Sequence, residues 1–267
     1  MRTIIAGTDF SASSVNACKY AAMLAQKINC KLTLFNLLDA PLIHSNVGLH
    51  GFFYTSIRST ANHKTEKLMR QMHRSFPNLK IESFSTTGSF KDELKYFVDR
   101  HQVVAAVMGL EAKERISKYL FGSHGVNLSG KIDCPVIIVP SQYRDHELSK
   151  VLLAVDNNEK LMKQSLKGFE KFLMQTHSNI DLLHVRTPME LFEPKTNALK
   201  LNKKHYEIQV LNAKNFEDGI KKRCTQTRSN MIAIISKTHS TFYNLFSESH
   251  TKRIAFAAKV PVMSVHE

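Results

Sequence analysis

The sequence predicts two tandem α/β domains, each a five-stranded parallel sheet with helices on both faces, over residues 1–141 and 150–267. Short apolar runs bounded by Gly, Pro or polar residues alternate with helix-length amphipathic segments, which is typical of buried parallel strands. A glycine-containing loop follows one of these runs. Four of the runs also recur in the second half, with a period too long for a solenoid. At 267 residues, each half is long enough to bury a core of its own.

The first half is predicted to begin with a strand at 4–8 and a helix at 11–28, for which Ser11 and Ser13 are candidate N-caps. The stretch 39–63 is aromatic and contains glycine, and a loop of this length is usually functional or mobile. The elements that complete this half are strands at 32–37, 80–86, 104–108 and 136–139, and helices at 64–76 and 90–101.

The second half repeats the strands of the first. The runs at 151–156, 180–185, 231–235 and 260–265 match those at 4–9, 32–37, 104–108 and 134–139. This alignment places Asp156 on Asp9. Two copies of one α/β domain are the simplest interpretation.

The loop between the last two strands of the first half has the composition of a phosphate site. A Gly-Ser pair, Gly122-Ser123, stands at the predicted start of a helix. Free backbone N–H groups at a helix start lie next to the positive end of the helix dipole, and both features favour phosphate. The strand before this loop reaches Gly109, at the edge where a parallel sheet presents its carboxyl ends.

The spacing Gly109-x2-Ala112-x9-Gly122-Ser123 resembles the nucleotide-binding signature of the universal stress protein family, Gly-x2-Gly-x9-Gly-Ser/Thr, with Ala112 in place of the second glycine. The segment IIAGTDFS at 4–11 resembles the first strand of the family and its Thr-Asp-Phe-Ser turn, and LTLFNL at 32–37 resembles its second strand. The resemblance covers almost the whole chain. It implies a tandem member with two Rossmann-like domains of the adenine nucleotide alpha hydrolase type.

The resemblance also implies a site for ATP, with Mg²⁺ as an accompanying ion. Asp9 would accept hydrogen bonds from the ribose hydroxyls, the backbone of Leu37 would meet adenine, and Gly109 would let the ribose approach. Residues beside these three and in the glycine loop complete the implied nucleotide-binding set: Thr8, Met108, Ala112, Gly122, Ser123, His124 and Gly125.

Each implied role has a simpler alternative. Asp9 would then only cap the first helix, Gly122-Ser123 would only begin the last one, and His124 would face solvent. Ala112 would cost about 1–2 kcal/mol if its position requires a positive φ. In the second half, the positions equivalent to Gly109, Ala112, Gly122 and Ser123 are occupied by Ser236, His239, Ser249 and His250. Because a Cβ obstructs close approach of phosphate, nucleotide binding is expected in the first half alone.

Composition excludes several classes of protein. No stretch reaches the length of a membrane span, and the N-terminus carries no secretory signal, so we expect a cytoplasmic protein. The four cysteines lack Cys-x-x-Cys spacing, and Cys18 and Cys134 are expected to be buried small hydrophobes. The histidines at 44, 50 and 63 share one stretch without the spacing of metal ligands, so no metal site is expected.

The net charge of +14 is divided evenly between the halves. Residues 1–150 hold 19 Lys and Arg against 12 Asp and Glu, and the remainder hold 18 against 11, so each half carries +7. There is no basic tail, and no aromatic ladder interleaves with the basic runs as it would in a groove for single strands. Nucleic acid is therefore not an expected partner.

The sequence contains no Ser-His-Asp arrangement, no Gly-x-Ser-x-Gly and no P-loop lysine. Three functions stay open: a nucleotide-responsive stress protein with at most slow ATP hydrolysis, a nucleotide-free adaptor that contacts an unidentified protein, and a true enzyme. The apolar terminal strands at 136–139 and 262–265 carry no charge to protect their edges. We expect them to pair antiparallel within the chain, as an internal pseudo-dimer that could still form a homodimer through its helices.

Overall fold

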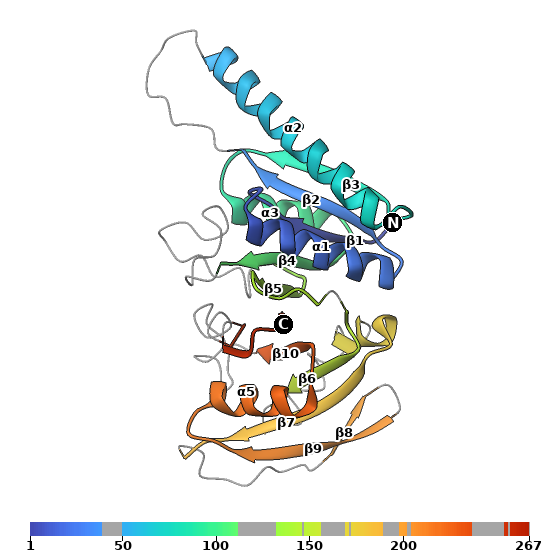
Figure 1. Ribbon diagram of the computed structural model, residues 1–267, viewed down its shortest axis with the longest axis vertical. Helices are drawn as coiled ribbons and strands as arrows, with labels where there is room; N and C mark the ends of the chain where they lie inside the picture. Colours follow the sequence, from blue (N-terminus) through green and yellow to red (C-terminus); the bar gives the residue numbers. More distant parts are fainter. Residues whose placement is uncertain are drawn as a thin grey trace.

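The computed structural model of the chain describes residues 1–38, 50–111, 132–145, 147–155, 169–170, 172–188, 198–201, 204–236, 254–255 and 257–266. Their strands form one 11-stranded sheet with the order β3-β2-β1-β4-β5-β11-β10-β6-β7-β9-β8. In Figure 1 the first half of the chain, coloured blue to green, lies above the second half, coloured yellow to red.

The first half forms a parallel sheet with the order β3-β2-β1-β4-β5. Its five strands are β1 (Thr3–Gly7), β2 (Lys31–Leu37), β3 (Ile81–Thr86), β4 (Val103–Leu110) and β5 (Val136–Pro140). All five were predicted. The sequence predicted that the apolar run before Gly109 would stop there, but this residue lies inside β4 and pairs with Val139 of β5.

The second half repeats this order as β9-β7-β6-β10-β11, again all parallel. Its strands are β6 (Lys150–Ala154), β7 (Asn179–Arg186), β9 (Lys204–Asn212), β10 (Met231–Ser236) and β11 (Val262–His266). An additional strand, β8 (Ala198–Leu201), pairs antiparallel with β9. Strand β8 was not predicted from the sequence.

The two halves join through their terminal strands. Strand β5 pairs antiparallel with β11, so that Ile138 lies opposite Val262 and Ile137 lies opposite Met263. The predicted antiparallel pairing of these edges is confirmed. It removes two apolar strand edges from solvent. The domain boundaries at 141 and 150 stay predictions.

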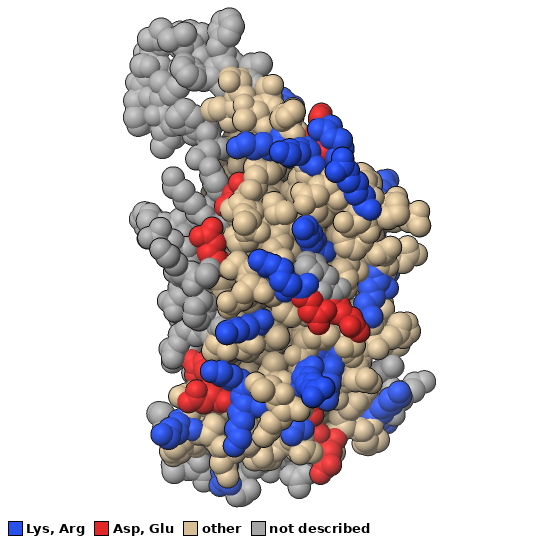
Figure 2. Space-filling model, viewed as in Figure 1, with Lys and Arg blue, Asp and Glu red and all other residues tan. Residues whose placement is uncertain are grey.

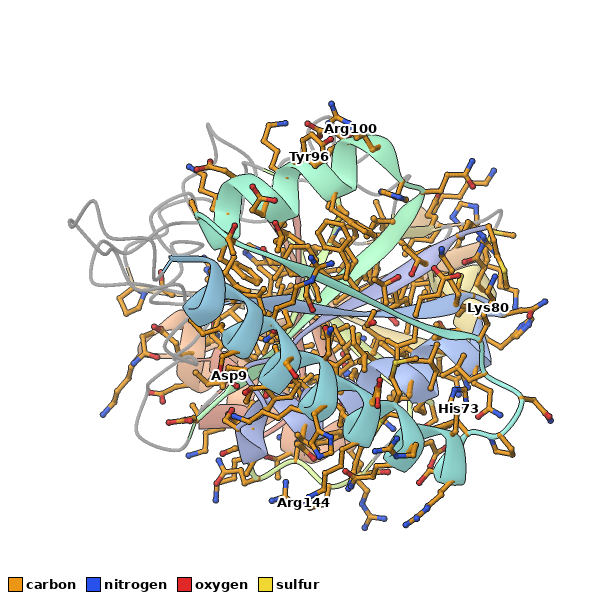
Figure 3. All side chains as sticks on the ribbon, turned by 90° about the horizontal axis from the view of Figure 1, so that it is seen from above. Asp9, His73, Lys80, Tyr96, Arg100 and Arg144 are labelled. Atoms are coloured by element: carbon orange, nitrogen blue, oxygen red, sulfur yellow. The ribbon has the colours of Figure 1, made fainter. Side chains whose placement is uncertain are left out.

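Helices cover both faces of the sheet. Helices α1 (Ala12–Lys27) and α2 (His50–Ser75) pack on one face, and α3 (Phe90–Arg100) and α5 (Phe216–Thr227) pack on the other. Figure 3 shows α3, with Tyr96 and Arg100, on the side of the sheet opposite to α1 and α2. Strand residues alternate between the layers, since Ile4 and Ala6 face one core and Ile5 faces the other.

Helix α2 corrects the expectation of a loop through residue 63. It begins at His50, although the sequence predicted a helix from about residue 64. From residue 56 onward its buried side chains are Ala61, Thr65, Leu68 and Met72, whose spacing of four, three and four places them on one face. This stripe begins before residue 64, so the helical period extends into the stretch that its aromatic residues and glycine suggested was a loop.

The surface agrees with an even distribution of charge. On the face shown in Figure 2, Lys and Arg side chains are spread over both halves and are interspersed with Asp and Glu. Among the helices of the described residues, none is long and apolar enough to cross a membrane. All four cysteines are buried and unpaired, as expected for Cys18 and Cys134.

Candidate functional site

The candidate site lies where β1 and β2 end at the carboxyl edge of the first sheet. The backbone N–H of Thr8 donates to the carbonyl of Phe35 over 2.9 Å, and Asn36 Nδ2 donates to the carbonyl of Thr8 over 2.7 Å. These bonds extend the alignment of the two strands by one residue beyond β1. Thr8, Asp9 and Leu37 therefore come together at one edge, as predicted from their positions at strand ends.

The turn from β1 into α1 is built from hydroxyl and carboxylate groups. Asp9 Oδ1 accepts from Ser11 N over 3.0 Å and from Ser11 Oγ over 2.6 Å. Ser11 is the N-cap of α1, because its side chain accepts from Ser14 N. The alternative in which Asp9 itself caps the helix is wrong, since Asp9 holds the capping residue in place. The N–H of Phe10 donates to Thr8 Oγ1 over 3.0 Å.

Phe10 has a left-handed backbone conformation, with φ of 64°. This conformation is uncommon for a bulky residue, and such conformations often occur at ligand sites. It leaves Phe10 in the wall of a cavity beside Asp9. The ammonium of Lys64 lies 5.7 Å from the centroid of the Phe10 ring, within the range of a cation–π interaction.

That cavity has a volume of about 300 Å³ and lies between the strand ends and α2. One wall consists of the strand-end residues and the other of α2, and the lining residues are Asp9, Phe10, Asn36, Leu37, Leu38, Ser56, Ile57, Thr60, Ala61 and Lys64. Figure 3 shows Asp9 close to α2. The wall formed by α2 was not predicted from the sequence. The feature of the sequence that could have predicted it is the spacing of four between Ser56, Thr60 and Lys64, which places these residues along one face of a helix.

The cavity combines apolar and polar groups. Leu37, Leu38 and Ile57 provide apolar surface, and the hydroxyls of Ser56 and Thr60 can donate or accept hydrogen bonds. Asp9 is the acidic residue and Lys64 the basic residue among those that line it. These groups suit a ligand with a flat apolar ring and hydroxyl groups. Among the residues that line this cavity, Asp9 is the one whose carboxylate would contact a divalent cation that accompanies such a ligand.

Two predicted site residues have structural roles in β4. Met108 is completely buried in the core on the α3 face, so its side chain is not part of the cavity. A Cβ on Gly109 would lie 2.5 Å from the carbonyl oxygen of Ser13 and 2.9 Å from Ser14 N. The glycine is therefore explained by the close approach of α1 to β4, and the approach of a ribose is not needed to account for it.

The predicted phosphate loop lies outside the described residues, and with it Ala112, Gly122, Ser123, His124 and Gly125. Of the positions that correspond to the motif in the second half, only Ser236 is described, at the end of β10. Asp156, which aligns with Asp9, is also outside the described residues.

A thiol lies under the turn that holds Asp9. Cys18 is completely buried, and burial raises the pKa of its thiol from 9.0 to about 12. A hydrogen bond with Thr8 lowers this pKa and the charge of Asp9 raises it, and both effects are smaller than that of burial. The thiol is therefore protonated at neutral pH and behaves as a small apolar group.

Comparisons with known proteins agree with this architecture. The model of the universal stress protein family matches residues 1–140. The crystal structure of a universal stress protein from Archaeoglobus fulgidus superposes with a TM-score of 0.67 at 14% identity, covering 99% of this chain and 96% of the other. A putative universal stress protein from Pseudomonas aeruginosa superposes with a TM-score of 0.57 at 10% identity, covering 100% and 93%. At these identities the likeness concerns the fold. No curated protein sequence matches this chain.

Proposed function

The chain belongs to the universal stress protein family, and we propose that its first half binds ATP or a related adenine nucleotide and that the chain acts as a cytoplasmic stress-response regulator or adaptor. One observation carries the proposal. The cavity of about 300 Å³ opens at the strand ends where sequence alone predicted the ligand, and Asp9 and Leu37 line it. The two residues to which the resemblance assigns ribose and adenine thus line one cavity, which supports the proposal.

The chemistry of the cavity supports an adenine nucleotide. Asp9 can accept hydrogen bonds from ribose hydroxyls, and Leu37, Leu38 and Ile57 can cover a purine ring. The phosphates would extend toward the predicted glycine loop at 109–125. When bound, ATP would supply the charge and shape that a protein partner could sense, with at most slow turnover.

An Asp9→Asn variant tests this role without removing the turn. Asn keeps one acceptor oxygen for Ser11, whose N–H and hydroxyl both donate to Asp9 Oδ1. It replaces the other oxygen with an NH₂ group, which cannot accept from a ribose hydroxyl. We expect ATP affinity to fall about tenfold or more, because hydrogen bonds to charged groups contribute about 1.5–3 kcal/mol.

The measurement is isothermal titration with ATP, together with mass spectrometry of any nucleotide released from the denatured protein. Asp92→Asn, at an exposed position in the first turn of α3, is the control. Wild-type protein that neither retains nor binds adenine nucleotide would contradict the proposal. Equal affinity of the Asp9→Asn and wild-type proteins would exclude Asp9 from the site.

The nucleotide-free adaptor is a second candidate, and two observations favour it. Ala112 departs from the family signature, and the packing of α1 explains Gly109 without any ligand. In this case the fold would serve protein contacts alone. The same titration decides, because an adaptor of this kind shows no saturable heat with ATP.

A further inference from the structure

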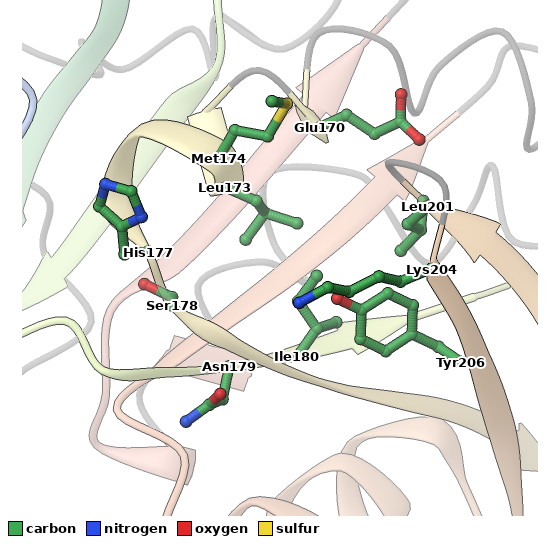
Figure 4. Close-up of a pocket in the computed structure, with 10 residues that line it drawn as sticks. All are labelled: Glu170, Leu173, Met174, His177, Ser178, Asn179, Ile180, Leu201, Lys204 and Tyr206. Carbon is green, nitrogen blue, oxygen red and sulfur yellow. The ribbon is translucent and has the colours of Figure 1, made fainter.

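A second and larger cavity lies in the second half, at the opposite end of the strands from the candidate nucleotide site. Its volume is about 520 Å³. It opens between the end of the helical segment 172–176, the start of β7 and the β8–β9 hairpin. Figure 4 shows the residues that line it: Glu170, Leu173, Met174, His177, Ser178, Asn179, Ile180, Leu201, Lys204 and Tyr206.

The repeat explains why this space exists. His177 has a φ of 50° and follows its helix as Asn29, with a φ of 52°, follows α1, so the two helices end in the same way. In the first half, α2 covers the face of the sheet next to the end of α1. Its residues Leu68 and Met72 are buried in the core with Leu32. In the second half, β9 takes the sheet position of β3, and β8 extends the edge beyond it. No helix among the described residues takes the place of α2 on this face, and the cavity lies there.

The register of the hairpin places a lysine on its inner face. Leu201 lies opposite Lys204, and Leu199 lies opposite Tyr206. Directly opposed residues of two antiparallel strands project to the same face, and both leucines are buried in the core. Lys204 and Tyr206 therefore project to the side of the core, where Tyr206 is partly buried and Lys204 is exposed. In Figure 4 the Lys204 ammonium and the Tyr206 hydroxyl point into the same space.

Among the described residues, no acidic side chain forms an ion pair with Lys204. Glu170 also lines the cavity and has an interaction of its own, and in Figure 4 its carboxylate points away from the Lys204 ammonium. Leu173 and Ile180 supply apolar surface beside this cation, and Met174 forms part of the rim with 52% of its surface exposed. The cavity thus places the Lys204 ammonium and a hydroxyl donor next to an apolar wall, with the Glu170 carboxylate at another part of the lining.

We propose that this cavity binds a small organic anion with an apolar body, such as an aromatic or aliphatic carboxylate. The ammonium of Lys204 and the hydroxyl of Tyr206 would contact the anionic group, and Leu173, Met174 and Ile180 would contact the body. The site belongs to the second half alone, because α2 occupies the corresponding place in the first half. The proposal does not depend on nucleotide binding.

The absence of tryptophan from the chain allows a direct test. Met174→Trp places a single tryptophan at the rim of the cavity, and Tyr96→Trp places one on α3 in the first half, at a side chain that is also 52% exposed. The probe is 8-anilinonaphthalene-1-sulfonate, an anion with an aromatic body. We expect saturable energy transfer from the tryptophan at position 174 and little from that at position 96. Equal transfer from both positions, or no saturation at position 174, overturns the proposal.

The role of the charge is tested with a second probe. N-Phenyl-1-naphthylamine has the same aromatic body without the sulfonate. In the Met174→Trp protein we expect the anion to bind roughly two- to fivefold more tightly than the neutral amine, a size that reflects the exposure of Lys204. Lys204→Met, which keeps an apolar stem, should abolish that preference. Lys200→Met, on the outer face of the same hairpin, should retain it.

A lysine that serves only to support the hairpin would give a different result. Lys204→Met would then weaken or spare both probes alike, and the preference for the anion would be unchanged. That outcome overturns the assignment of Lys204 as the anion-binding group. Thermal unfolding of each variant establishes that the comparison is made between folded proteins.

Discussion

Asn36 and His184 occupy equivalent positions in the two halves, and each bonds to the backbone carbonyl that follows the neighbouring first strand. Asn36 Nδ2 donates to the Thr8 carbonyl over 2.7 Å, and His184 Nδ1 donates to the Val155 carbonyl over 3.2 Å. Thr8 and Val155 are themselves equivalent, since their N–H groups donate to Phe35 and Leu183 over 2.9 Å in both halves. Two different side chains thus fix the same strand end.

This equivalence predicts an asymmetric pair of mutations. Asn36→Ala removes the partner of a buried carbonyl and should lower the free energy of unfolding by about 1–3 kcal/mol. His184→Asn supplies an amide donor at the equivalent place and should cost less than Asn36→Ala. Chemical denaturation measures both values. A larger loss for His184→Asn would show that the imidazole has a packing role that an amide cannot replace.

Two glycines provide a test of close packing. A Cβ on Gly109 would meet backbone atoms of Ser13 at 2.5 Å, whereas a Cβ on Gly219 would meet the side chain of Val185 at 2.5 Å. At position 219, inside α5, alanine favours the helix by about 1 kcal/mol relative to glycine and offsets part of the contact with Val185, whereas the backbone at the start of α1 is held by its cap. We therefore expect Gly109→Ala to cost about 1–3 kcal/mol and Gly219→Ala to cost less, as measured by thermal unfolding. The reverse order would contradict the packing explanation of Gly109.

The β5–β11 strand pair that joins the two halves provides a third prediction. Ile138 is only 5% exposed and lies opposite Val262 in the β5–β11 pair. Ile138→Lys places an ammonium between two apolar strands, so we expect a loss of at least about 2 kcal/mol, with separation of the halves or precipitation. Val210→Lys, at a position of β9 that is 45% exposed, is the matched control. Sedimentation and denaturation that show Ile138→Lys to be as compact and stable as Val210→Lys would contradict this prediction.

Much of the fold could be predicted because the buried strands are short, apolar and repeated. The run at 104–108 and its counterpart at 231–235 are apolar on both faces, which is unusual outside a covered parallel sheet. Strand β8 could not be predicted, because four residues with two leucines carry no distinctive period. The beginning of α2 was missed because Gly51 and the aromatic residues around it suggested a loop, while the spacing of its buried residues is set by contacts with the sheet.

The candidate site was predictable only in part. Asp9 and Leu37 could be placed because the ends of parallel strands meet at one edge. The sequence could not show that Gly109 accommodates the backbone of Ser13. A glycine is required both where a ligand approaches the chain closely and where another segment does, and the sequence does not distinguish these two cases. It also could not show that α2 closes the cavity, since this depends on where a long helix packs.

The buried cysteines predict a dependence on pH. Burial raises the pKa of the thiols of Cys18 and Cys134 from 9.0 to about 12 and that of Cys224 to about 11, and it also raises the pKa of Cys30. A raised thiol pKa favours the folded state fully below the unfolded value of about 9, and this contribution is lost as the pH rises toward 12. Because the thiols are buried and protonated at pH 8, they should resist alkylation by iodoacetamide in the native protein and should react only when the protein unfolds. Rapid labelling of any of the four thiols, read by mass spectrometry, would show that it is accessible in the folded state.

The last prediction concerns the wall that α2 contributes to the candidate nucleotide site. Lys64 lines the cavity and lies over the Phe10 ring, whereas Lys67, one turn further along the same helix, is exposed and is not among the lining residues. If the cavity holds ATP, Lys64→Gln removes a cation near the ligand and should weaken binding roughly two- to fivefold, a size that reflects screening of an exposed charge by solvent. Lys67→Gln makes the same change in net charge and should leave the affinity unchanged. Titration with ATP at two salt concentrations measures both, and the difference between the variants should shrink as salt increases. Equal weakening by both substitutions would mean that only the overall field of the helix acts on the nucleotide, and that α2 does not contact it.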